Sequence, residues 1–99
     1  MRPREMAYAR HVYHIYAVRS ADRCALQRTL QSHGVQTGIH YPIPVHLQEG
    51  YRDLGYVAGD FPHSEQAARE VLSLPMYPEL SNNKIEFVSA AVHHDVQTV

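Results

Sequence analysis

Apolar and polar side chains alternate along three stretches of the chain, and this pattern predicts β-strands. The first strand is expected over His11–Arg19, where both faces are largely apolar, as in a strand that is covered on both sides or central in its sheet. A second is expected over Val35–Tyr41, where alternate residues are apolar or β-branched. A third, over Ser73–Met76, is interrupted by Pro75 and therefore belongs at a sheet edge or a strand end.

Apolar residues three and four positions apart predict a helix between the first two strands. Ser20 is expected to cap it, and Asp22 places a negative charge in the first turn, where the helix dipole favours one. The helix should run to His33 and bury an apolar stripe that consists of Ala25, Leu26 and Leu30. Gly34 follows at the position where a left-handed residue ends many helices.

Three further helices are expected in the second half of the chain. Leu47, Tyr51 and Leu54 have helical spacing and predict a short helix that ends at Gly55. Pro62 suits a first helical position, and Glu65 complements that N-terminus. The apolar stripe of this helix would be Ala67, Ala68, Val71 and Leu72. Ser81 should cap a final helix with inward residues Ile85, Val88, Ala91 and Val92.

This order of elements predicts an α+β fold, a two-layer sandwich in which helices pack on one face of a small three-stranded sheet. The first two strands could be parallel with a right-handed crossover, or antiparallel neighbours. The 99 residues predict one domain that buries about two thirds of its unfolded surface. We expect a loose lead-in over 1–9, the domain over 10–95 and a frayed tail over 96–99.

Composition narrows the possible partners and compartments. The net charge is −1 with neutral histidines, which disfavours nucleic acid and anionic membranes as partners. No apolar run is long enough to predict a membrane span or a signal peptide. Cys24 is the single cysteine, so an internal disulfide and a CxxC site are excluded, and we expect it to be a small packing residue. These features are typical of a cytoplasmic protein.

A Pro-rich segment follows the second predicted strand and contains the main candidate site. Pro42 and Pro44 fix their φ angles and withhold two backbone donors. The segment is therefore stiff, and it presents His40, Tyr41 and His46 with little conformational entropy left to lose. These polar groups suit a ligand site, although Pro-rich loops also serve only as rigid turns.

The chain contains eight histidines, but their spacing does not favour a metal site. His11 and His14 lie three residues apart in a predicted strand and would point to opposite faces. His93 and His94 are adjacent on a predicted helix, so one ion could not easily receive both. Neither pair has the ligand spacing of a structural zinc site.

Three blocks of sequence together resemble one family. The blocks are HVYHIYAVR at 11–19, TGIHYPIPVHLQ at 37–48, and GDFP at 59–62 with EVLSLPMYPEL at 70–80. They closely resemble the C-terminal small domain of the DegT/DnrJ/StrS sugar aminotransferases over roughly residues 10–95. The family uses pyridoxal phosphate (PLP) to place an amino group on a keto sugar attached to a nucleotide. The resemblance implies the small-domain fold of fold type I aminotransferases, which packs beside a large domain at a dimer interface.

The resemblance also assigns roles to individual residues. His40 and Tyr41 stand where the family's Gly-x-His-Tyr-Pro motif reaches the substrate cleft, and both can donate hydrogen bonds to sugar or diphosphate oxygens. His46 would support substrate binding, or alternatively cap or orient the short helix that follows it. Gly38 would allow close approach of the backbone. His14 matches a strand histidine of the family and is expected to be a satisfied core residue.

The resemblance finally predicts what the chain would lack. In this family the PLP lysine lies in the large domain, whereas the single lysine here, Lys84, is expected to be a solvated residue of the last helix. We therefore expect PLP in the full-length enzyme, with a nucleotide sugar and an amino donor as substrates and a homodimer as the assembly. This segment alone should neither bind PLP nor transaminate. The alternative is a non-catalytic module that binds a sugar nucleotide or another partner.

Overall fold

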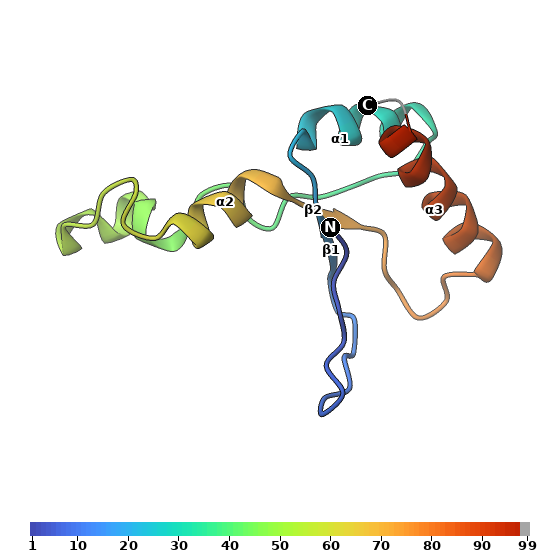
Figure 1. The fold of residues 1–99 in the computed structure, drawn as a ribbon, viewed down its shortest axis with the longest axis horizontal. Helices are drawn as coiled ribbons and strands as arrows, with labels where there is room; N and C mark the ends of the chain where they lie inside the picture. The colour runs from blue at the N-terminus through green and yellow to red at the C-terminus, as the bar shows by residue number, and fades with distance from the viewer. Residues whose placement is uncertain (98–99) are drawn as a thin grey trace.

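The computed structural model describes residues 1–97, with side chains for residues 1–93. The elements are a strand β1 (Tyr16–Arg19), helix α1 (Arg23–Ser32), two 3-10 helices η1 (Val45–Leu47) and η2 (Glu49–Leu54), helix α2 (Pro62–Glu70), strand β2 (Val71–Leu74) and helix α3 (Asn82–Gln97). Figure 1 shows α1 and α3 beside the sheet, and a long projection that we call the arm (residues 40–70) extending away from them.

The sheet has two antiparallel strands within the described residues, so the expected three-stranded sheet is not shown. β1 pairs with β2 from Tyr16↔Leu74 to Arg19↔Val71. The expected second strand is reduced to one bridge, in which Gly38 and Ser73 exchange hydrogen bonds of 3.1 and 2.7 Å. β2 therefore lies between β1 and Gly38, and neither arrangement expected for the first two strands, parallel or antiparallel neighbours, is observed.

Both observed strands differ in length or position from the expected ones. The strand expected over His11–Arg19 is regular only from Tyr16, and Tyr13 has a positive φ of 51°. The pairing with β2 ends at Tyr16↔Leu74, and the left-handed backbone of Tyr13 is incompatible with an extended strand. Val71 and Leu72, which were expected on a helix, begin β2 instead.

Two arginine side chains hold the place where α2 passes directly into β2. Arg23 donates to the carbonyl oxygens of Ala68 and Val71 at 2.5 and 3.4 Å, which satisfies acceptors at the end of α2. Arg19 donates through Nε and Nη2 to one carboxylate oxygen of Glu70, at 3.0 and 2.8 Å. Hydrogen bonds from Gln66 and Arg19 lower the pKa of the Glu70 carboxyl.

The ends of α1 show which of its two expected caps form. Asp22, not Ser20, is the N-cap, and its carboxylate accepts from the Ala25 amide at 3.0 Å. At the other end, the Gly34 amide donates to Gln31 and the Val35 amide to Leu30, which is the Schellman arrangement. Gly34 has a φ of 76°, as the sequence predicted. Leu30 and Val35 are both buried in the core.

Substitution of Gly34 by alanine is expected to lower the free energy of unfolding by about 1 kcal/mol, because a Cβ atom disfavours its left-handed backbone. Gly50 is the matched control, since it has no positive φ and no atom within 4 Å of an added Cβ. Gly50→Ala should be neutral or stabilise by up to about 1 kcal/mol. Urea denaturation of both variants measures the difference, and equal effects would contradict the prediction.

The remaining helices follow the expectations only in part. α2 begins with Pro62, as predicted. Ser81 caps α3, its hydroxyl accepting from the Lys84 amide at 3.4 Å, but the expected inward residue Ile85 is 46% exposed. The single helix expected after the Pro-rich segment is two 3-10 helices, which Gly55 ends. A frayed tail was expected over 96–99. Helix α3 continues to Gln97, and 98–99 lie outside the described residues.

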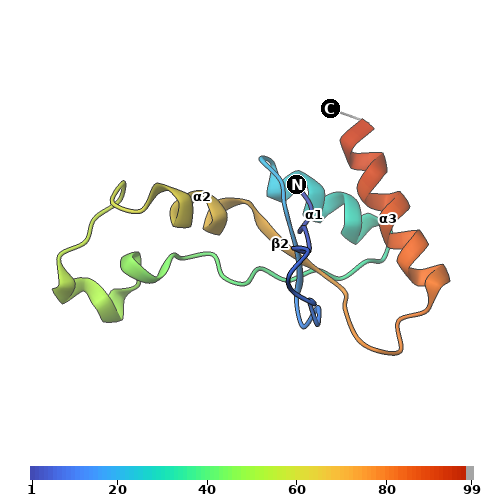
Figure 2. The same cartoon turned by 60° about the horizontal axis from the view of Figure 1, so that its bottom comes forward.

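The core lies between the sheet and the pair α1 and α3, which pack on the same face (Figure 2). Its buried apolar residues are Val18, Leu26, Leu30, Val35, Leu72 and Ala91. Leu30 and Leu72 are completely inaccessible to solvent. Two residues that were expected to be interior, His14 and Cys24, are exposed, because the segment around His14 has no partner strand and Cys24 lies away from the buried stripe of α1.

The molecule exposes more surface than a compact protein of its mass. Its accessible area is 7889 Å², whereas about 5,700 Å² is typical of 11.3 kDa. The radius of gyration is 15.6 Å, against about 13 Å for a compact domain of this length. About half of the unfolded surface is buried, not the expected two thirds. The arm and the loop before β1 account for this open shape (Figure 1).

Candidate functional site

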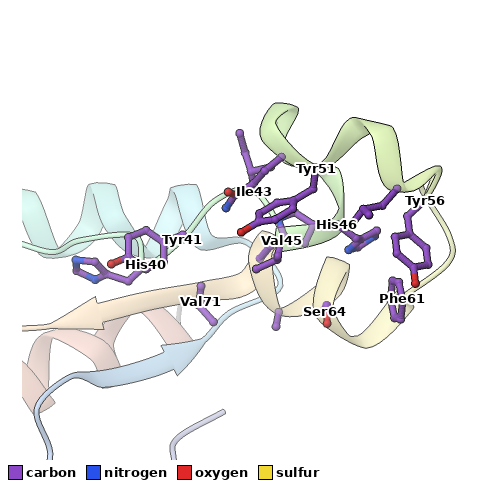
Figure 3. A pocket seen from close by; sticks show the side chains of 15 residues that line it. His40, Tyr41, Ile43, Val45, His46, Tyr51, Tyr56, Phe61, Ser64 and Val71 are labelled. Carbon is purple, nitrogen blue, oxygen red and sulfur yellow. The ribbon is translucent and has the colours of Figure 1, made fainter.

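An open hollow of about 640 Å³ lies along the arm, between the Pro-rich segment and α2 (Figure 3). Its first part is formed by His40, Tyr41, Ile43, Pro44 and Val45. Its far part is formed by aromatic and small residues of η2, the turn after it, and α2, namely Tyr51, Tyr56, Phe61, Ser64 and Ala67. The hollow therefore combines apolar walls with a few phenol, imidazole and hydroxyl groups, which is the usual composition of a small-molecule site.

Three of the four predicted site residues gather where the arm leaves the sheet. The His40 Nδ1 atom lies 2.9 Å from the Ser73 hydroxyl, and the His40 and Tyr41 rings meet edge to face at 5.4 Å. The peptide bond between them is cis. A Cβ atom on Gly38 would lie only 2.9 Å from His40 Cε1. Gly38 therefore allows a close approach of the His40 imidazole, a side chain, whereas the prediction was a close approach of the backbone.

The fourth predicted residue, His46, lies deeper in the far part of the hollow. Its side chain is only 7% exposed, with Nε2 3.4 Å from a Glu65 carboxylate oxygen. Within the described residues, Nε2 has no hydrogen-bond partner of good geometry, so the contact with Glu65 is an ion pair only when the imidazole is protonated. The ring also meets Phe61 edge to face at 4.8 Å. His46 thus joins η1 to the beginning of α2.

Glu65 organises the turn that precedes α2. Its carboxylate accepts the Gly59 amide at 2.8 and 3.0 Å and the Phe61 amide at 3.1 Å. The hydrogen bond from Gly59 is the largest cause that lowers the pKa of the Glu65 carboxyl, and the Phe61 amide and His46 act in the same direction. The expected role of Glu65 at this helix N-terminus is therefore confirmed, and its carboxylate also supports one wall of the hollow.

Acidification is expected to release this turn. Because the folded-state pKa of Glu65 lies below its ordinary value of 4.5, its stabilising effect is complete above that value and is lost as the pH falls through the folded-state pKa. The amide proton shift of Gly59, followed by NMR, should therefore titrate with a midpoint below 4.5. Glu65→Gln should abolish that titration, and a Gly59 shift that does not change with pH would contradict the assignment.

The sequence did not point to several residues that the structure brings to this site. Ser73 was placed at the start of a strand, without a role, although a polar residue between Leu72 and Leu74 is an available signal. Of the aromatic residues that line the hollow, Tyr51 was predicted only as part of a short helix, and Tyr56 and Phe61 were given no role. Their convergence depends on how the arm folds back on α2, which no local pattern shows.

The described residues offer no fit to PLP or to a metal. Lys84 is exposed in the first turn of α3. It lines neither the hollow on the arm nor a second hollow, which lies between the sheet and α3. Nothing there resembles a lysine held for a Schiff base. In the part of the chain that the structure describes, no group of three or more His, Cys, Asp or Glu could hold a metal ion. No described helix has both the length and the hydropathy to cross a membrane.

Comparison with known protein families identifies the chain. The profile of the DegT/DnrJ/EryC1/StrS aminotransferase family matches residues 1–93. The chain belongs to this family. The resemblance seen in the three sequence blocks is therefore confirmed at the level of the family, and the Gly-Ile-His-Tyr-Pro segment that lines the hollow lies within the matched region.

Individual members of the DegT/DnrJ/EryC1/StrS family cover most of this chain. The erythromycin biosynthesis sensory transduction protein EryC1 of Saccharopolyspora erythraea is 46% identical over 91% of the chain and 25% of its own length. A dTDP-3-amino-3,6-dideoxy-alpha-D-galactopyranose transaminase of Aneurinibacillus thermoaerophilus is 43% identical over 84% of the chain and 22% of its own length.

A solved family structure also matches the fold. The DegT DnrJ EryC1 StrS aminotransferase of Brucella abortus superposes with a TM-score of 0.85 and 31% identity over 94% of the chain, which is 25% of that protein. The chain therefore spans about a quarter of the length of the relatives it matches.

Proposed function

We propose that this chain acts as the C-terminal small domain of a PLP-dependent aminotransferase that converts a nucleotide-linked keto sugar to an amino sugar. The observation that carries the proposal is the family membership over residues 1–93, together with a similar transaminase that is named for a dTDP-linked amino sugar. In the proposed enzyme, the nucleotide sugar and the amino donor are the substrates, and two copies form a cytoplasmic homodimer.

His40 and Tyr41 are the residues that we assign to the substrate. They line the hollow, and a neutral imidazole and a phenol can each donate a hydrogen bond to a sugar or diphosphate oxygen. Tyr41 is 69% exposed, so its hydroxyl is accessible to a ligand. His46 supports the far wall through its contacts with Glu65 and Phe61, and Gly38 provides the space that the His40 ring occupies.

The catalytic group that holds PLP is assigned to a part of the enzyme outside this chain. The exposed position of Lys84 supports that assignment, because the residue lines neither of the two hollows described above. When it is bound, PLP would supply the electron-withdrawing chemistry of amino transfer. The residues of this chain would only bind and orient the sugar.

The excess surface of the chain supports a domain that is covered by a partner. The accessible area exceeds that of a compact protein of this mass by about 2,200 Å², and a standard interface buries about 800 Å² on each side. Exposed apolar residues are concentrated on the arm, including Tyr41, Ile43, Val45, Leu54 and Val57. Patches of this kind mark interaction surfaces.

A chimaera tests the proposal. The matching segment of the Aneurinibacillus thermoaerophilus transaminase would be replaced by the corresponding residues of this chain, and formation of the amino sugar would be followed by chromatography. We expect transaminase activity that falls at least about tenfold in the double variant His40→Ala, Tyr41→Phe, since two hydrogen bonds to substrate are lost. An inactive chimaera that still shows the absorbance of bound PLP would contradict the proposal.

The isolated chain separates the enzyme-domain proposal from the alternative of a binding module. Borohydride reduction in the presence of PLP, followed by mass spectrometry, should give no specific adduct at Lys84. Calorimetry with a dTDP-sugar should give no heat at micromolar concentrations, because half of a cleft supplies few converging polar groups. Tight binding that is lost in His40→Ala would favour the independent module instead.

A further inference from the structure

The Ser73 hydroxyl is a buried polar group at the centre of the sheet. Ser73 is 7% exposed and lies between Leu72 and Leu74 on β2. Because side chains alternate along a strand, Ser73 points to the face opposite the core residue Leu72. Its N–H and C=O groups both hydrogen-bond to Gly38, and it stands opposite Ala17 of β1.

The imidazole of His40 covers this hydroxyl. Its Nδ1 atom lies 2.9 Å from Ser73 Oγ, and its Cε1 atom lies only 2.9 Å from the position that a Cβ of Gly38 would take. Tyr41 adds an edge-to-face contact on one side of the ring (Figure 3). The ring is therefore placed by a hydroxyl, a glycine and an aromatic neighbour, even though His40 as a whole residue is exposed.

The hydrogen bond has a preferred direction. A buried hydroxyl needs an acceptor for its proton, and within the described residues the His40 Nδ1 atom is the partner recorded for Ser73 Oγ. If the hydroxyl donates to Nδ1, the proton of the neutral imidazole must be on Nε2. His40, which lines the hollow, then carries its one ring N–H donor on Nε2.

We propose that Ser73 is a positioning residue for His40: its hydroxyl holds the imidazole in the Nε2–H tautomer and turns that donor towards the hollow. The ligand class that such a donor fits is an anionic or hydroxyl oxygen of a sugar nucleotide, and this part rests on the proposed function. The tautomer itself does not depend on that function, so the two parts can be tested separately.

NMR of the chain with ¹⁵N-labelled histidine rings tests the tautomer, with His40→Gln assigning the His40 signals by their loss. At about pH 8, where an ordinary histidine is neutral, we expect His40 to show a protonated Nε2 and an unprotonated Nδ1. Ser73→Ala should give a mixture of tautomers, and Ser73→Thr should restore the wild-type pattern. Ser32→Ala, on the exposed end of α1, is the control and should leave the His40 signals unchanged.

Two results would overturn the positioning role. One is a protonated Nδ1 in the unaltered chain, a measurement that requires no variant to fold. The other is a His40 tautomer that is the same in Ser73→Ala as in the unaltered chain, with amide spectra showing that both are folded.

The chimaera links the tautomer to substrate. There, Ser73→Ala should lower kcat/KM about tenfold, the effect typical of one lost hydrogen bond, and Ser73→Thr should recover most of it. An inactive unmodified chimaera would count against the proposed function while leaving the tautomer result intact. An active chimaera whose kcat/KM is unaffected by Ser73→Ala would refute the ligand part of this inference.

Discussion

Replacement of Leu72 by alanine is expected to lower the free energy of unfolding by about 2–5 kcal/mol. Leu72 is completely buried and belongs to the core cluster that joins the sheet to α1 and α3. Its truncation removes apolar contacts and leaves a cavity that neighbouring side chains fill only partly. Small domains have a total stability of about 5–15 kcal/mol, and this one has few buried side chains. Thermal or urea unfolding followed by circular dichroism measures the loss.

Leu54→Ala is the matched control for Leu72→Ala. Leu54 is 65% exposed on η2, so the same truncation should change the unfolding free energy by no more than about 0.5 kcal/mol. If the two variants had similar stability, the core would not lie where the structure places it.

Substitution of Gly38 by alanine is expected to impair the site while leaving the fold almost intact. The added Cβ would lie 2.9 Å from His40 Cε1, which is closer than carbon atoms pack, so the imidazole must move. The ring is at the end of a side chain and can rotate away, but it then loses its 2.9 Å contact with Ser73. In the chimaera described above, we expect the affinity for the nucleotide sugar to fall about tenfold, which corresponds to about 1.4 kcal/mol.

Two measurements on Gly38→Ala must diverge for this explanation to hold. The KM for the sugar should rise, whereas the melting temperature should change by only a few degrees, about the effect of 1 kcal/mol on a domain of this length. Gly50→Ala makes the same chemical change on η2 with no atom within 4 Å, so it should leave KM unchanged and should not lower the melting temperature. A large loss of stability without a change in KM would assign Gly38 to the fold alone.

Local signals in the sequence predict most of the helices correctly. Pro62 and Glu65 mark the beginning of α2, Gly34 marks the end of α1, and Ser81 caps α3. Each of these signals acts through backbone groups within a few residues, so no tertiary information is required. The N-cap was placed at Ser20 instead of Asp22, because both residue types cap helices well and the two lie within one turn of each other.

Strands were harder to predict because a strand exists only where it has a partner. The alternation in residues 11–15 is as regular as in β1, yet the pairing with β2 stops at Tyr16 and the left-handed backbone of Tyr13 interrupts the segment. Val35–Tyr41 also alternates, but it meets β2 only at Gly38. Alternation records which face could be buried, whereas the register between distant segments decides which residues pair.

The candidate site was predictable only in part. The family motif indicated His40 and Tyr41, and the structure places both on one hollow. Ser73 could not be assigned from the sequence, because its contact with His40 spans 33 positions and depends on the Gly38 bridge. The mutual contact of His46, Glu65 and Phe61 likewise requires the arm to fold back on α2.

The direct passage from α2 into β2 restricts how the arm can move relative to the sheet. Glu70 ends the helix and Val71 begins the strand, and Arg19 and the Ser20 amide both hold Glu70 at that point. A hinge needs a few residues that are free to change their φ and ψ angles, and this side of the arm's base has none. On this side, the sheet and the arm should therefore move together as one rigid body.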